Sequence, residues 1–495
     1  MQQEQEQQET TLAGDGENER ELIEMLNSIS LHIPGAACTK IEEAKENLIR
    51  ECSLHIEMAR AQRLLYQMLE KAAVDDAKDA VEHTKRWYTL TCDFGQNMQC
   101  PFYNSNQPGC TYYYTPLNIY NFGVVDHSYD YGNRMIGNHM HCHVYHEGIG
   151  KKGGTNVASL IVKTLRDMNI LRENNPGGEL NIIFDNCTGQ NKNNTVLKLA
   201  MWLKEMGYFM QVNFVFLIVG HTKNACDRLF NSLKHQYRQK NTYTMDELIE
   251  SLRWSQKITV IRTENGDFLD YDVLFKVAYN DLKGLVTKNH IFTCDVVDNE
   301  DELWMSISIR ESNLEDCGLT KHIAMKQGMR SAADLEAHMN QLLKPITPPG
   351  INPYKLVELY AKYCPVVHEE YWEDELYLKP DNKVLKKFKE AKVIRKDNRE
   401  KVKAVKEGDS VKGSGGDGIE DEIDKMNVAQ LKLALKSYGL TIDGLKADLR
   451  ARLNAHQLEE FNSGGGSTPP LTSGPTSDTV MEDTTKLVAE DMTDK

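Results

Sequence analysis

The feature that most constrains this chain is an apolar run that ends abruptly in a carboxylate. Residues Asn181 to Phe184 read as a buried strand, and Asp185 follows them at the start of a turn rich in amide side chains. The periodicity after this turn predicts a helix from Thr195 to Tyr208 and a second apolar strand from Gln211 to Val219. A metal-dependent site would place a ligand at such a strand end.

Two further Asp residues stand at comparable boundaries. Asp93 ends a segment that begins at Arg86, in which alternating and aromatic residues are typical of a strand. Asp227 lies in the turn that opens the next helix. Between Asp93 and Asp185 the sequence predicts two more strands and one helix, over Tyr112 to Val125, His139 to Glu147 and about Asn156 to Met168.

The resulting order is strand, strand, strand, helix, strand, helix, strand, helix. This order resembles the ribonuclease H-like fold, in which carboxylates from the first strand, the end of the fourth strand and the last helix converge on divalent metal. Asp93, Asp185 and Asp227 occupy those three places. The predicted fold class is α/β: a ribonuclease H-like mixed sheet flanked by helices, with helical additions and a small C-terminal helix-turn-helix-like module.

Four segments carry a more specific resemblance: residues 154–159, 185–193, 220–222 and 226–230. Together they resemble a transposon-derived eukaryotic family of largely uncharacterised proteins related to the DDE transposases. The resemblance runs from roughly His55 to Tyr377 and is clearest between Asp93 and Phe230. It implies a divalent-metal-dependent phosphoryl transferase or endonuclease that acts on DNA.

The expected cofactor is Mg²⁺ or Mn²⁺. Magnesium prefers oxygen ligands and takes one or two carboxylates together with waters and substrate phosphate. Two such ions, roughly 3.5–4 Å apart, would activate water or a DNA 3′-hydroxyl and stabilise the leaving oxygen. In this scheme Asp93 bridges the ions, Asp185 and Asp227 each hold one, and His221 polarises the water. The amides expected to orient phosphate or the carboxylates are Asn186, Gln190 and Asn191.

Simpler interpretations compete with this one. An Asp at a strand end is most often a turn former or a helix cap, and a cap would explain Asp227 equally well. Asp246, Glu247 or Glu250 would then be the substitute third acid. The competing function is a catalytically inactive, domesticated nuclear protein that binds DNA or chromatin. An exonuclease of the same fold acting on RNA is a third option.

The net charge of −15 is unevenly distributed. Residues 1–20 hold six acids and one base, and residues 461–495 hold six acids and two bases, so much of the acidity lies in the two tails. Residues 383–406 carry 11 Lys or Arg against three acids, a net charge of +8. This segment is either a solvated linker helix or a segment for phosphate contact or nuclear import.

A second specific signal lies between residues 427 and 454. Two short helices are predicted around Gly439, and each has one apolar seam, because its Leu residues are four apart at 431 and 435 and at 449 and 453. The segment resembles a SAP domain, a module that binds DNA, and its expected phosphate contacts are Lys436, Lys446, Arg450 and Arg452. The alternative is a helical hairpin that contacts only protein.

Composition completes the expected organisation. The 11 Cys include no C-x-x-C pair, and no apolar run approaches the ~20 residues of a membrane-spanning helix, so we expect a reducing intracellular compartment and no membrane partner. The resemblance to DNA-binding families implies the nucleus. A homo-oligomer is compatible with the sequence. The expected domains are an acidic tail (1–20), a helical preface (21–85), the core (86–240), a mixed α/β accessory region (241–380), a basic helical segment (381–407), a linker (408–420), the SAP-like domain (421–457) and a second acidic tail (458–495).

Overall fold

The computed structural model describes two units of the chain, residues 1–392 and 393–495. In the first unit the described residues are 36–79, 87–133, 135–171, 178–299, 302–314, 321–324, 332–386 and 388. In the second they are Leu431, Leu435, Leu449, Arg450 and Leu453.

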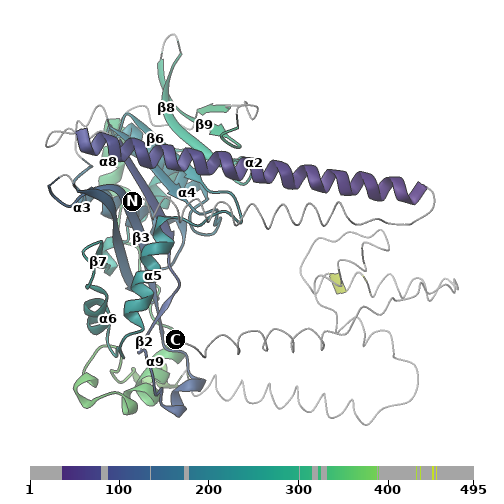
Figure 1. Ribbon diagram of the computed structural model, residues 1–495. Coiled ribbons are helices and arrows are strands. Elements are labelled where there is room, and N and C mark those ends of the chain that lie inside the picture. Colours follow the sequence, from purple (N-terminus) through teal and green to yellow (C-terminus); the bar gives the residue numbers. More distant parts are fainter. Residues whose placement is uncertain are drawn as a thin grey trace. The chain divides into compact units, whose positions relative to one another are not determined.

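Ten described strands of the first unit form one mixed sheet (Figure 1). Their bounds are β1 Trp87–Phe94, β2 Met98–Cys100, β3 Leu117–Asp130, β4 Ile136–His146, β5 Glu179–Phe184, β6 Gln211–Phe216, β7 Ile258–Arg262, β8 Ile291–Asn299, β9 Glu302–Arg310 and β10 Lys321–Ala324. Nine strands follow one another in the order β10-β9-β8-β6-β5-β1-β3-β4-β7, and β2 pairs with β3 outside this path.

The centre of the sheet is β1. It pairs in parallel with β5 on one side and antiparallel with β3 on the other. The parallel part continues from β5 to β6, whereas β3 and β4 form an antiparallel pair. At the far ends β8 adds antiparallel to β6, and β7 adds parallel to β4. The fold is therefore a mixed α/β sheet with flanking helices.

The described helices of this unit are α2 Ala36–Asp79, α3 Gly154–Asp167, α4 Asn194–Glu205, α5 Ala225–Tyr237, α6 Met245–Leu252, α7 Tyr271–Ala278, α8 Ala332–Leu342 and α9 Pro353–Glu358. Short 3-10 or π turns are η1 Gly109–Tyr113, η2 Asn265–Asp267, η3 Leu359–Tyr363, η4 Cys364–Val366 and η5 Glu369–Tyr371. Figure 1 shows α2 as a long helix lying across the sheet. None of the described helices is both long enough and apolar enough to cross a membrane.

The two faces of the sheet bury different helices because side chains alternate along each strand. One face, which includes Leu90 and Phe122, packs against α3, α4, α7 and α8. The opposite face includes Val125 and Met140 and packs against α5 and α6. On this second face Tyr66 of α2 covers strands β5 and β6. The residues directed toward α2 and α5 are therefore the odd-numbered positions at the end of β1.

Most predicted elements are present, with shifted ends. The helical preface expected over residues 21–85 contains one continuous helix in its described part, α2. The strand expected from Tyr112 begins at Leu117, because η1 occupies residues 109–113 and Pro116 has no N–H for the ladder. Strands β2, β7, β8 and β10 were not predicted. Strands β7 to β10 of the expected accessory region extend the same sheet.

In the second unit, Leu431, Leu435, Leu449 and Leu453 are helical and buried. This agrees with the two apolar seams expected for the SAP-like domain. The acidic tails, the linker at 408–420 and most of the basic segment at 381–407 lie outside the described residues.

Candidate functional site

The register of the two central parallel strands brings two of the expected carboxylates together. Cys92 of β1 pairs with Phe184 of β5, so the next residues, Asp93 and Asp185, stand at neighbouring strand ends. Parallel strands lie about 4.8 Å apart, and residues in register direct their side chains to the same face. That face is the one covered by α2 and α5.

The third acid, Asp227, lies in the first turn of α5. Two contacts fix this turn above the end of β1. The thiol of Cys226 donates to the carbonyl of Thr91 at 3.2 Å, and the side chain of Asn224 hydrogen-bonds Asp93. The structure therefore brings the start of α5 to the strand end that carries Asp93.

The pKa values reflect this proximity. Burial raises the pKa of Asp93 from 3.8 to about 7, and the charges of Asp185 and Asp227 add to the rise. The N–H of Phe94, which donates to Asp93 Oδ1 at 2.7 Å, opposes part of it. Burial also raises the pKa of Asp185, and Asp227 contributes in the same direction. Three acids that repel one another in a partly buried site form an arrangement that a cation would stabilise.

The donor set suits a hard cation with few protein ligands. Among the described residues, no group of three or more His, Cys, Asp and Glu side chains is arranged to hold a metal ion. Asp227 Oδ2 accepts from the N–H of Asn224 at 2.9 Å and completes a capping box at α5. Asp93 and Asp185 remain as a pair of carboxylates, which is the number Mg²⁺ commonly takes from protein.

The acids considered as substitutes for Asp227 are engaged at α6. Asp246 pairs with Arg262, and Glu250 lies within 3.9 Å of Arg253. Glu247 accepts from the N–H of Tyr243 at 2.7 Å. In contrast, Asp227 contributes to the raised pKa of both Asp93 and Asp185.

The other expected site residues lie in two turns. Asn191 is buried and donates its amide to Asp185 Oδ1. Gln190 accepts through its backbone carbonyl from Asn193 at 2.9 Å, and Asn186 is half-buried beside Asp185. His221 follows β6, and its ring lies 5.4 Å from the ring of His55 on α2.

One cation near the acids was missed by the sequence reasoning. Lys152 lies in the turn before α3, with its Nζ 4.8 Å from the ring centre of Phe94 and 5.1 Å from that of Tyr120. Burial lowers the pKa of Lys152, and the negative charge of Asp93 acts against this change. In the sequence it stands in a Gly-rich stretch, 148–155, that approaches a phosphate loop but has Gly154 where such a loop requires Lys.

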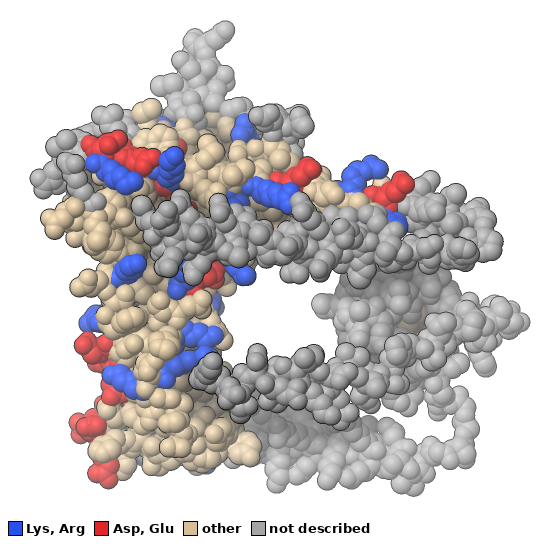
Figure 2. Space-filling model, in the orientation of Figure 1, with Lys and Arg blue, Asp and Glu red and all other residues tan. Residues whose placement is uncertain are grey.

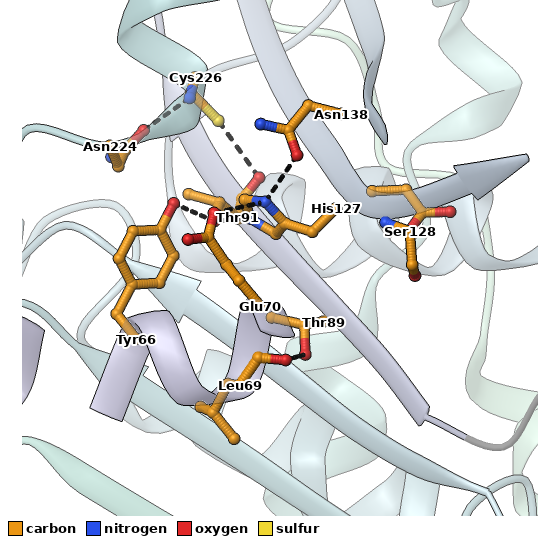
Figure 3. A network of polar contacts seen from close by, with 11 residues as sticks. Tyr66, Leu69, Glu70, Thr89, Thr91, His127, Ser128, Asn138, Asn224 and Cys226 are labelled. Carbon is orange, nitrogen blue, oxygen red and sulfur yellow. Dashed lines mark hydrogen bonds and ion pairs between the residues drawn. The ribbon is translucent and has the colours of Figure 1, made fainter. Parts of the chain in front are cut away.

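A buried polar network supports β1 from below the site (Figure 3). Nε2 of His127, on β3, forms a hydrogen bond of 2.7 Å with Thr91 Oγ1. Nδ1 of the same ring lies 2.7 Å from Glu70 Oε1 of α2. Although burial favours neutral Glu70, the ion pair with His127 holds the pKa of this carboxyl below its ordinary value. Thr89 Oγ1 also donates to the carbonyl of Leu69 at 2.8 Å. These contacts fix α2 to the strand that carries Asp93.

Comparison with known families assigns two parts of the chain. Residues 125–310 match a family model described as a domain of unknown function, DUF7869. Residues 422–458 match the model of the SAP domain. The chain therefore has a C-terminal SAP domain. No curated protein and no solved structure matches the chain significantly.

The two matches divide the candidate residues. The DUF7869 domain runs from within β3 to the end of β9 and includes Asp185 and Asp227, whereas Asp93 lies before its first residue. Within the SAP domain, Arg450 is helical and half-buried. Lys436, Lys446 and Arg452 lie outside the described residues.

Proposed function

We propose that this protein is a transposase-derived, divalent-metal-dependent DNA phosphoryl transferase or nuclease whose SAP domain anchors it to DNA. The observation that carries the proposal is the β1–β5 register, which places Asp93 beside Asp185 on the face where α5 begins. Asp93 and Asp185 are both half-buried and both have raised pKa values, so a cation held between them would offset an electrostatic cost that their local turn contacts do not remove.

The order of elements supports a ribonuclease H-like core. Apart from the short β2, the chain runs β1, β3, β4, α3, β5, α4, β6, α5. This is the order that the resemblance to the ribonuclease H-like fold implies. The three acids stand at the end of the first strand, after the fourth strand and in the last helix of that series.

Each group at the site has a role in this proposal. Asp93 and Asp185 would hold Mg²⁺ or Mn²⁺, which supplies Lewis acidity and a deprotonated water or hydroxyl when bound. Asn191 orients Asp185, and Asn224 orients Asp93. Asp227 would act as a ligand through the oxygen that does not cap α5, and His221 would polarise the attacking water.

The SAP domain supports DNA as the partner, because this module is associated with DNA and chromatin binding. We infer that it contributes affinity with little sequence preference, through cations that contact phosphate. Lys436, Lys446, Arg450 and Arg452 are the proposed contacts. A nuclear location follows from the proposed DNA partner.

One observation favours a second function. The capping box that occupies Asp227 is an ordinary structural use of an acid, and it leaves two carboxylates rather than three in the described site. The same arrangement fits a catalytically inactive protein that keeps the fold and binds DNA or chromatin through its SAP domain.

A nicking assay separates the two functions. Full-length protein is incubated with supercoiled plasmid and Mg²⁺ or Mn²⁺, and the wild type is compared with Asp185→Asn and with Asp75→Asn. Asp75 is an exposed residue of α2 in a surface ion pair with Lys78. Asp75→Asn is therefore the same substitution as Asp185→Asn, made at a surface position outside the candidate site. The proposal expects nicking by the wild type and the Asp75 variant and loss with Asp185→Asn. Absence of metal-dependent nicking by the folded wild type favours the binding protein.

A further inference from the structure

A polar groove runs along α5 from Asp227, one of the candidate acids. Its volume is about 380 Å³, and Asp227 stands at one end of it. The described residues that line it are Phe94, Gly95, Gln96, Asn97, Met98, Gln99, Phe102, Asn121, Asp227, Phe230, Asn231, Lys234, Tyr237 and Arg238. Helix α5 forms one wall, and the segment from the end of β1 to β2 forms much of the other.

The α5 wall changes from acidic to basic along its length. Asp227, Asn231, Lys234 and Arg238 are spaced by four, three and four residues, so they share one helix face. From Asp227 to Arg238 this face covers roughly 16 Å at 1.5 Å per residue. Lys234 and Arg238 therefore stand at the end of the groove remote from the acids.

The surroundings of the groove are positively charged although the protein is acidic overall. Between residues 222 and 240 there are five Lys or Arg and one Asp, a net charge of +4. Asp227 is the only carboxylate among the described residues that line the groove. Figure 2 shows Lys and Arg side chains gathered on this face, in the region where α5 and β2 lie in Figure 1.

The opposite wall is rich in amides and is held in place. Gln96, Asn97 and Gln99 contribute uncharged hydrogen-bonding groups. The hydroxyl of Tyr237 accepts from the N–H of Gln99 at 2.9 Å and donates to its carbonyl at 3.0 Å, which ties α5 to β2. Phe102 packs on Tyr237 with 4.0 Å between ring centres. Both walls are therefore positioned before any ligand arrives.

We propose that this groove binds the sugar-phosphate backbone of a DNA strand and leads it to the acids. Lys234 and Arg238 pair with phosphates, and the amides of the opposite wall hydrogen-bond sugar and phosphate oxygens without reading sequence. The cations at this end of the groove attract the negative charge of phosphate, whereas carboxylates would repel it, so the charge favours a polyanion at this place. This inference rests on the proposed function, because the strand is led toward the acids only if they form the reactive site.

The test measures DNA binding in EDTA, where cleavage does not contribute. Full-length wild type, Lys234→Gln/Arg238→Gln and the matched control Lys276→Gln/Lys283→Gln are titrated with labelled single- and double-stranded oligonucleotides between roughly 50 and 200 mM salt. Lys276 lies on α7, and Lys283 is exposed in the segment that follows it. The control removes the same charge from the face of the sheet opposite α5.

The expected result is a flatter salt dependence for the groove variant. Losing two phosphate contacts lowers the slope of log K against log salt by about 1.4 for a single strand and about 1.8 for a duplex. The control keeps the wild-type slope, and Lys234→Arg/Arg238→Lys, which retains both charges, keeps it as well. Equal slopes for the groove variant and its control with both DNA forms would overturn the inference, as would loss of the slope with charge-retaining Lys234→Arg/Arg238→Lys.

The outcome is distinguishable from that of the proposed function. Asp185→Asn removes a metal ligand but no groove cation, so it should bind DNA in EDTA at least as tightly as the wild type. A flattened slope for the groove variant together with an inactive wild type would support DNA binding in the groove and contradict the proposed catalysis. Metal-dependent nicking with an unchanged slope would retain the chemistry and reject the groove.

Discussion

Asp93 and Asp185 stand at the ends of two adjacent parallel strands, one residue beyond the pair formed by Cys92 and Phe184. Because the strands are in register, their carboxylates are neighbours by virtue of backbone pairing alone. Rotation of a side chain changes their separation but not their adjacency. The electrostatic cost of this placement is the basis of the first two expectations.

Asp93→Asn should stabilise the metal-free protein at high pH. The pKa of Asp93 is raised from 3.8 to about 7, so folding favours its protonated form. The stability linked to this proton is fully present below pH 4 and is lost as pH rises through about 7. In EDTA at pH 8 the variant should melt about 1–2 °C above the wild type, equivalent to about 1 kcal/mol, and the difference should shrink at pH 5. Thermal unfolding followed by circular dichroism at both pH values measures this, and a wild type that gains stability relative to the variant as pH rises would contradict it.

Divalent metal should reverse this pH dependence. Mn²⁺ binds deprotonated carboxylates, so protons compete with it below the raised pKa of Asp93. The melting temperature of the wild type should rise with Mn²⁺ at pH 8 and rise less at pH 5.5, while Asp185→Asn should show a smaller increase at both. An increase that is the same for wild type and variant would place the metal elsewhere.

Asn191→Ala should weaken metal-dependent activity without unfolding the protein. Asn191 donates to Asp185 and helps to lower the pKa of that carboxyl, so its loss leaves Asp185 less oriented and harder to ionise. Removing such a supporting contact commonly costs about 10–100-fold in metal affinity or activity. Nicking rates measured across a range of Mn²⁺ concentrations should show the loss most clearly at low metal. Asn265→Ala, an exposed position in η2, is the control, and equal rates for Asn191→Ala and wild type would remove Asn191 from the site.

Glu70→Gln should destabilise the fold through the network beneath β1. The ion pair lowers the pKa of Glu70, so its contribution is present above pH 4.5 and is lost as pH falls through the lowered value. Loss of a hydrogen bond to a charged group costs about 1.5–3 kcal/mol. Urea unfolding at pH 7 measures the change, with Glu57→Gln, an exposed position on the same helix, as control. Equal midpoints for the two variants would show that the network does not hold α2 on the sheet.

The sequence predicted those elements whose periodicity is unambiguous. The apolar run before Asp185 and the alternating, aromatic segment before Asp93 were both found as strands, since burial on one or both faces leaves a clear pattern. The short strands β2 and β7 were missed because three to five residues carry too little pattern to separate a strand from a turn. Strand β8 was missed inside a region read as mixed, since its pairing with β6 is a tertiary contact.

The candidate site shows the same division. Asp93 and Asp185 were predicted from strand ends, and register alone then places them together. The sequence could not decide whether the Asp227 carboxylate only caps α5 or also takes part in the site. Asn224 and Asp227 have capping-box spacing whether or not Asp227 also binds a ligand. Lys152 and the groove cations Lys234 and Arg238 were missed, because their position depends on how turns and helix faces pack against β1 and β2.

The central claim is that Asp93 and Asp185 share a divalent cation. The most direct measurement is an anomalous difference map from crystals of the full chain soaked in Mn²⁺ at pH 8. The account predicts a peak between the two carboxylates, with oxygen distances near 2.1–2.2 Å, close to the ~2.0–2.1 Å typical of the smaller Mg²⁺, and its absence in Asp185→Asn crystals. A map without a peak at these strand ends, in crystals where Mn²⁺ is seen at other carboxylates, would contradict it.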